Sequence, residues 1–143
     1  MTKLIPFKKE HLECMDIREH EQVLLSNVTH LDALENSIAK TGIIDGKIIA
    51  CGGVLPFFNG NGELWLIPSI YVKDYRVTFV KVIKEWIEDV AHNLALRRLQ
   101  SNCIDDELHG SWMAHMGFQR EGTLRKYHDG MDYAVWGRLW AQS

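Results

Sequence analysis

The stretch that decides the fold is Trp112–Tyr127: Trp-Met-Ala-His-Met-Gly-Phe-Gln-Arg-Glu-Gly-Thr-Leu-Arg-Lys-Tyr. It begins inside a predicted helix, Asp106–Met116, and Gly117 can end that helix because glycine tolerates the left-handed conformation of a C-cap. Phe118–Arg125 and Asp132–Trp140 then have the composition of two strands joined by a turn that contains Asp-Gly. A helix followed by paired strands predicts a chain that mixes helices with a sheet.

Working outward, the amphipathic segment Arg76–Leu94 predicts the longest helix. Its apolar residues recur every three or four positions, at Phe79, Ile83, Trp86, Val90 and Leu94. The residues of Arg98–Ile104 alternate as in a strand. Near the N-terminus, the same kinds of pattern predict a strand over Lys3–Pro6 and helices over Lys9–Leu25 and His30–Ala39.

The middle of the chain carries a hairpin signal. Asp45-Gly46 separates two apolar runs, Gly42–Ile44 and Lys47–Leu55, and this dipeptide favours the positive φ angles of a tight hairpin turn. The segment Phe57–Gly62 has the composition of a loop. Glu63–Ile70 predicts a further strand, which contains Pro68 and therefore lies at an edge or a bulge, or where the strand splays.

These elements alternate along one chain of 143 residues, of which 46% are hydrophobic and 24% charged. That length and composition predict a single folded domain spanning 1–143. The order strand, two helices, three strands, helix, strand, helix and two strands predicts a domain of the mixed α/β (α+β) class. The expected architecture is a central mixed sheet of six or seven strands flanked by about four helices.

Several functional classes are disfavoured. The net charge is −3 and the pI is near 6.1, so bulk positive charge does not predict nucleic-acid binding. An apolar run that could span a membrane and a secretory leader are both missing from the sequence, so we expect a soluble protein made in the cytoplasm. Three widely spaced cysteines predict reduced, mostly buried thiols. The seven histidines do not form a recognisable metal motif, so no metal is expected.

The element order resembles that of the GNAT acetyltransferases. The pairs Gly117-Phe118 and Glu121-Gly122 have the usual spacing of that family. A narrower resemblance is to the GNAT-like internal virion protein A of podovirus phages, carried by Arg18-Glu-His-Glu21, Ala33-Leu-Glu-Asn-Ser37, Asp45-Gly46, Trp65, His109 and Trp112. It implies phage virion or host proteins as partners and a location in the host cytoplasm or the virion. The oligomeric state stays open, a homo-oligomer included.

The family resemblance implies a site for acetyl-CoA at the start of the helix after the fourth strand. The family's motif there is Arg/Gln-x-x-Gly-x-Gly/Ala, and Arg76 matches its first position. Phe79 and Lys81 stand where the small residues belong, and a bulky Phe79 should block the phosphates, although Lys81 adds charge. The backbone N–H of Ile70 or Tyr71 is the candidate donor to a thioester carbonyl.

The resemblance also implies an acid and a base. Many relatives carry a tyrosine acid four positions before the glycine of Gly-Phe, but here that position is Met113. Tyr127 is the candidate substitute acid, and Glu63, on the fourth strand, is the candidate base for a substrate ammonium group. Asp106 stands where the family often has asparagine.

Two hypotheses therefore stand beside each other. In the first, which we favour, the chain is a GNAT-fold phage protein without efficient catalysis that binds proteins in virion assembly and needs no cofactor. In the second, it is an active N-acetyltransferase that uses acetyl-CoA, Glu63 and Tyr127. An unrelated α/β domain is a third reading.

Aromatic residues offer further candidates for contacts. Trp65 could line the central cleft, and Trp136 and Trp140 share one face of the last strand, which is either a contact surface or packed against a helix. His109 and Trp112 share one helical face, which favours packing or a partner over a metal site.

Overall fold

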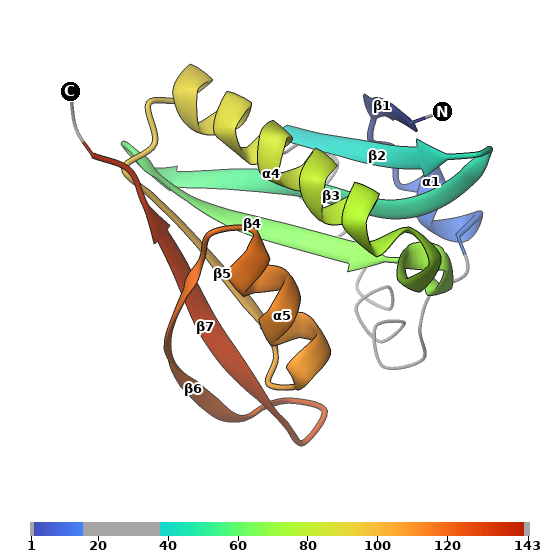
Figure 1. The fold of residues 1–143 in the computed structure, drawn as a ribbon. Helices are drawn as coiled ribbons and strands as arrows, with labels where there is room; N and C mark the ends of the chain where they lie inside the picture. Colours follow the sequence, from blue (N-terminus) through green and yellow to red (C-terminus); the bar gives the residue numbers. More distant parts are fainter. Residues whose placement is uncertain (1, 16–37, 142–143) are drawn as a thin grey trace. The chain divides into compact units, whose positions relative to one another are not determined.

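The computed structural model describes residues 2–15 and 38–141 of the chain (Figure 1). The elements, in chain order, are β1 (Thr2–Pro6), α1 (Glu10–Glu13), β2 (Ile38–Ile44), β3 (Lys47–Phe58), β4 (Asn61–Pro68), the 3₁₀ helix η2 (Ile70–Tyr75), α4 (Arg76–Asn93), β5 (Arg98–Ile104), α5 (Glu107–His115), β6 (Gln119–His128) and β7 (Met131–Leu139). Most of the strands and helices predicted from residue patterns are confirmed.

The strands form one mixed sheet in the order β1-β2-β3-β4-β5-β7-β6. Strands β4 and β5 are parallel, and β1–β2, β2–β3, β5–β7 and β6–β7 are antiparallel. The expected fold class and a sheet of seven strands are confirmed. Within the described ranges there are three α-helices, and none is long and apolar enough to span a membrane.

Two N-terminal predictions are only partly tested. The predicted helix Lys9–Leu25 begins as α1, but α1 ends at Glu13 with Cys14 as its C-cap, so the helix is wrong at Cys14 and Met15; residues 16–25 lie outside the described residues. The predicted helix His30–Ala39 also lies largely outside them, but its last two residues, Ile38 and Ala39, are the first residues of β2. The helix predicted from the spacing of apolar residues is therefore wrong at this end, because Ile38 and Ala39 pair with Val54 and Gly53 of β3.

The chain divides into two compact units, which are described separately. Unit 1 contains 1–55 and 64–79, and unit 2 contains 56–63 and 80–143. Whether they form the predicted single domain stays a prediction.

In unit 1, the predicted β2–β3 hairpin is confirmed. Its turn residues Asp45 and Gly46 both have positive φ, 51° and 77°. The core of this unit contains Leu12 of α1, Cys51 of β3 and Ile67 of β4, together with Phe7 and Met15 on either side of α1. Trp65 packs edge-on against Phe7 with 5.1 Å between ring centroids, so Trp65 belongs to this core.

In unit 2, both helices contact the same face of the β5–β7–β6 sheet. The guanidinium of Arg138 on β7 pairs with Glu88 of α4. Gly110 of α5 lies against the Trp136 ring, since a Cβ there would meet Trp136 at 3.6 Å. Trp140 stacks under Arg138 at 4.7 Å and donates from Nε1 to Glu88. The two tryptophans therefore pack toward the helices, and the contact-surface alternative for them is wrong.

The predicted loop Phe57–Gly62 was wrong. Strand β3 continues to Phe58, a two-residue turn follows at Asn59-Gly60, and β4 begins at Asn61. Gly60 has φ 83°, and its carbonyl accepts hydrogen bonds from the backbone of Arg97. The glycines and asparagines of this segment indicated a break in regular structure, but they could not show how far the strands extend on either side of the turn.

Gly53 should be indispensable for the packing of unit 1. A Cβ at Gly53 would lie 2.7 Å from the Ile38 carbonyl oxygen and 2.7 Å from Trp65 Nε1. We expect Gly53→Ala to lower the free energy of unfolding by about 2–3 kcal/mol in urea denaturation, because backbone cannot move aside cheaply. Gly42→Ala is the matched control, since its Cβ would make ordinary 3.7 Å contacts. Equal losses in both variants would contradict this account.

Candidate functional site

The segment between β4 and α4 is where the family resemblance places the phosphates. Ser69 is buried and is the N-cap of η2, where its Oγ accepts a hydrogen bond from the backbone N–H of Tyr71 at 3.2 Å. The 3₁₀ helix Ile70–Tyr75 then runs directly into α4 at Arg76, whose φ and ψ are −53° and −48°. The backbone is therefore helical without interruption from Ile70 to Asn93.

This backbone has no phosphate nest. A nest needs successive N–H groups in alternating right- and left-handed conformations, and glycine usually supplies the left-handed residue. The sequence has no glycine between Gly62 and Gly110, and no residue from 69 to 81, all of which are described, has positive φ. In a continuous helix, most backbone N–H groups bond within the helix itself.

Three contacts hold this helical segment on the β2–β3 hairpin of unit 1. The N–H of Ser69 donates to the carbonyl of Ile49 at 2.7 Å. The hydroxyl of Tyr75 donates to Asp45 at 3.2 Å, and the Lys47 ammonium lies 5.1 Å from the centroid of the Tyr71 ring. The strand, the turn and the helix thus fix one another, which stabilises the helical form of the segment.

The predicted cofactor residues fall at different places along it. Arg76 is exposed at the first residue of α4, and Lys81 is exposed further along the same helix. The N–H of Tyr71 donates its hydrogen to Ser69 Oγ, so this hydrogen is already used and is not available to a thioester carbonyl. Ile70 remains a prediction as a backbone donor, and its side chain is 42% exposed.

Phe79 does not act as the sequence predicted. Its side chain is 4% exposed, so the ring faces the protein interior and not the surface on which phosphates would lie. A bulky ring at a close-approach position was the expected obstacle. The obstacle is instead the helical backbone, because the ring is needed as a buried apolar residue of α4.

The two predicted catalytic residues both belong to unit 2, where the sheet register separates them. Glu63 pairs with Gln100 on β5. The ring of Tyr127 packs 5.3 Å from that of Tyr133, whose β5 partner is Ile104. The distance along β5 between Gln100 and Ile104 is about 13 Å. Glu63 and Tyr127 therefore do not converge on one reacting atom within this unit.

Helix α5 carries the position of the missing acid. Met113 is buried at 5% exposure, so this position is occupied by a packed apolar side chain. Asp106 is the N-cap of α5 and accepts from the His109 N–H at 2.8 Å. The His109 ring is buried and lies edge-on to Trp112, with 5.2 Å between centroids. His109 and Trp112 thus serve packing, and the described residues contain no group that could hold a metal ion.

Two of the cysteines, Cys51 and Cys103, have a raised pKa and are therefore not activated nucleophiles. Burial raises the pKa of Cys51 to about 11 and that of Cys103 to about 12, so both are protonated thiols at neutral pH. All three cysteines are unpaired, as expected, but only Cys51 is buried, Cys103 is half-buried and Cys14 is exposed, so the prediction of mostly buried thiols was wrong.

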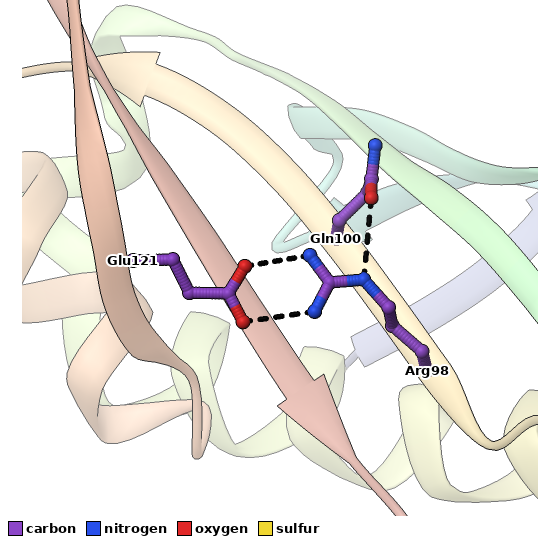
Figure 2. Close-up of polar contacts among 3 residues, drawn as sticks. All are labelled: Arg98, Gln100 and Glu121. Carbon is purple, nitrogen blue, oxygen red and sulfur yellow. Dashed lines mark hydrogen bonds and ion pairs between the residues drawn. The ribbon is translucent and has the colours of Figure 1, made fainter.

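Sequence reasoning missed a polar cluster on β5 and β6. Arg98 makes two parallel hydrogen bonds to Glu121, at 2.8 and 2.6 Å, and its Nε donates to Gln100 at 3.3 Å (Figure 2). The pair crosses over β7 at Gly137, where a Cβ would lie 2.9 Å from Arg98 Nη1 and would collide with Glu121. The alternation of Arg98 and Gln100 was a visible signal, but only strand order brings Glu121 to them.

The Arg98–Glu121 pair should make stability depend on pH. Hydrogen bonds from Arg98 lower the pKa of Glu121 from 4.5, so its stabilisation is present above pH 4.5 and is lost as the pH falls through the folded-state pKa. Because both side chains are partly exposed, we expect Glu121→Gln to cost about 0.5–1 kcal/mol at pH 7 in urea unfolding.

The difference between wild type and Glu121→Gln should be smaller at pH 3 than at pH 7. Asp105→Asn, which removes a single 3.0 Å contact with Arg120, is the control and should cost less. A loss from Glu121→Gln that is the same at pH 3 and pH 7 would rule out the ion pair as its source.

Among the known proteins compared, only solved structures are similar to this chain. No protein-family profile matches the chain, and no curated protein matches it significantly. Among solved structures, Ard1 from Thermoplasma volcanium matches with a TM-score of 0.77 at 10% identity, covering 99% of both chains. An IAA acetyltransferase from Bacillus cereus matches with a TM-score of 0.74 at 9% identity, covering 98% of this chain and 100% of that one.

A GNAT family acetyltransferase from Elizabethkingia anophelis, with acetyl-CoA bound, matches with a TM-score of 0.67 at 12% identity. The match covers 97% of this chain and 98% of that chain. At these identities the likeness concerns the fold alone. The seven-stranded mixed sheet and the similarity to these solved structures together show that the chain has the fold of the GNAT acetyltransferases.

Proposed function

We propose that this chain is a GNAT-fold protein that has lost efficient acetyl transfer and acts by binding proteins. The observation that carries the proposal is the uninterrupted helical backbone from Ile70 to Asn93. A pyrophosphate on a helix N-terminus is bound by N–H groups that point at the ligand. Where the chain is already helical, those groups bond to carbonyls of the preceding turn, so residues 69–81 do not fit the phosphates of acetyl-CoA.

The chemistry of acetyl transfer is also poorly supported. A departing thiolate needs a proton donor, and Met113, at the position of the usual tyrosine, has none. Glu63 and Tyr127 are too far apart along the register of unit 2 to act on one atom. The Tyr71 amide is engaged by Ser69. The proton donor, the acid–base pair and the amide donor to the thioester carbonyl are thus each incomplete.

The proposed setting is a phage virion. It rests on the sequence resemblance to the internal virion protein A of podovirus phages, and the partners would be virion or host proteins met in the host cytoplasm or inside the particle. A GNAT fold without its cofactor still offers a stable sheet with exposed loops and faces. Protein binding is the function that remains for such a scaffold.

One observation favours the alternative of an active N-acetyltransferase. Arg76, which matches the first position of the family's phosphate motif, is exposed at the start of α4. In that case acetyl-CoA would be the cofactor and would supply the acetyl group. Its binding would require residues 69–76 to leave the helical form that Asp45, Lys47 and Ile49 hold in place.

Titration calorimetry with acetyl-CoA and with CoA separates the two functions. We expect no saturable binding up to about 1 mM, a free energy weaker than about −4 kcal/mol, because the nest is missing. The Elizabethkingia anophelis acetyltransferase serves as the positive control. Micromolar binding that Arg76→Ala weakens, while Lys84→Ala on the same helix does not, would overturn the proposal and establish the alternative.

A further inference from the structure

We propose that His11 is a pH-sensitive latch, which holds the start of α1 on the sheet of unit 1 while its ring is neutral and releases it when the ring is protonated. The ring nitrogen Nδ1 has two hydrogen-bond partners. The backbone N–H of Lys8 donates to it at 3.1 Å, and Thr41 Oγ1 of β2 lies 2.7 Å from it. One atom therefore connects the chain just before α1 with the sheet.

The Lys8 contact determines which form of the ring is present. A backbone N–H can only donate, so Nδ1 presents its lone pair and a neutral ring carries its hydrogen on Nε2. Thr41 then donates its hydroxyl hydrogen to Nδ1. The Sγ of Cys51 lies 3.4 Å from Thr41 Oγ1, and because the hydroxyl hydrogen is already used, the thiol donates to the hydroxyl oxygen. The hydrogen bonds thus run in one direction, from Cys51 through Thr41 to His11.

Protonation of the ring reverses this direction. An imidazolium ring carries a hydrogen on both nitrogens and has no acceptor. Its Nδ1–H can donate to Thr41, whose own hydrogen then turns to Cys51, so these two fully buried side chains keep a partner. The N–H of Lys8 instead loses its acceptor and faces another N–H. The step adds one proton to Nδ1 and breaks one hydrogen bond, the one from Lys8.

The other groups around the ring leave this hydrogen bond to decide the outcome. Burial raises the pKa of Cys51 to about 11, so Cys51 stays a thiol between about pH 5 and pH 8, where histidines titrate. The strand partners of Thr41 are Ile5 and Cys51, and neither is charged. The ring also packs edge-on against Phe7, with 6.2 Å between centroids. The charges next to His11 along the chain are two of each sign, namely Lys8, Lys9, Glu10 and Glu13.

The segment that this latch controls runs from Phe7 to Met15. The N–H of Phe7 donates to the carbonyl of Ala39 in β2 at 3.3 Å, and the Lys8 contact follows directly after it. The apolar side chains of this segment and two strand residues together form the core of unit 1, namely Phe7, Leu12, Met15, Cys51 and Ile67. Release of Lys8 therefore loosens a segment that covers part of this core. The inference goes beyond the proposed function and does not depend on it, because neither a partner nor a cofactor takes part.

Nuclear magnetic resonance of the full chain, labelled with ¹⁵N, tests the latch in the wild type. At pH 8 we expect the ring of His11 to carry its hydrogen on Nε2, which the shifts of its two ring nitrogens report. Between pH 8 and pH 5 we expect the Lys8 amide to lose about fivefold in protection from solvent exchange, corrected for the intrinsic rate, since a neutral hydrogen bond contributes about that factor. This loss should follow the titration of the His11 ring in the same spectra.

Two variants separate the latch from other effects of pH. His11→Gln keeps a side-chain acceptor at every pH, as glutamine does in a capping box, and should make the protection of Lys8 independent of pH. His92→Gln, at an exposed histidine in the last turn of α4, is the matched control and should keep the wild-type loss. Far-UV circular dichroism checks that each variant is folded.

Three results would each overturn the proposal. They are a hydrogen on Nδ1 of His11 at pH 8, a wild-type Lys8 amide whose protection does not change with pH, and a His11→Gln variant that shows the same change as the wild type. The first two need no variant, so they test the latch even where a substitution prevents folding.

Discussion

The constraint that sets the backbone conformation between β4 and α4 is the missing glycine in this segment. Without a residue that adopts the left-handed conformation, the chain leaves β4 at Pro68, caps itself with Ser69 and continues as a helix from Ile70. Contacts with Asp45, Lys47 and Ile49 then hold that helix on a hairpin whose own turn needs positive φ. The segment after β4 is thereby kept helical, and the proposed loss of acetyl-CoA binding rests on this observation.

In unit 2, the presence of a glycine, Gly137, allows a side-chain contact that another residue would prevent. Gly137 has no side chain, which leaves room on β7 for the ion pair between Arg98 and Glu121. The pair links β5 to the edge strand β6 through side chains, across the intervening strand β7. Arg98 also donates from Nε to Gln100, which orients the Gln100 amide.

Much of the fold could be predicted from local patterns. The amphipathic run after Arg76, the Asp45-Gly46 turn and the glycine stop at Gly117 each depend on a few neighbouring residues, and each is confirmed. The extent of β3 and β4 around Asn59-Gly60 could not be predicted, because pairing with a distant strand and the Arg97 backbone stabilise it. The same holds for Ile38 and Ala39, whose helical spacing is overridden by pairing with β3.

The sequence by itself determined the fold class, the element order and the absence of the phosphate motif, because these follow from residue types and their spacing along the chain. Only the tertiary structure decided that Phe79 is buried, that the Tyr71 amide is engaged and that Glu63 and Tyr127 are separated. It alone brought Arg98 and Glu121 together over Gly137. The physical reason is that strand order and register set which side chains share a face, and both depend on contacts between residues far apart in the chain.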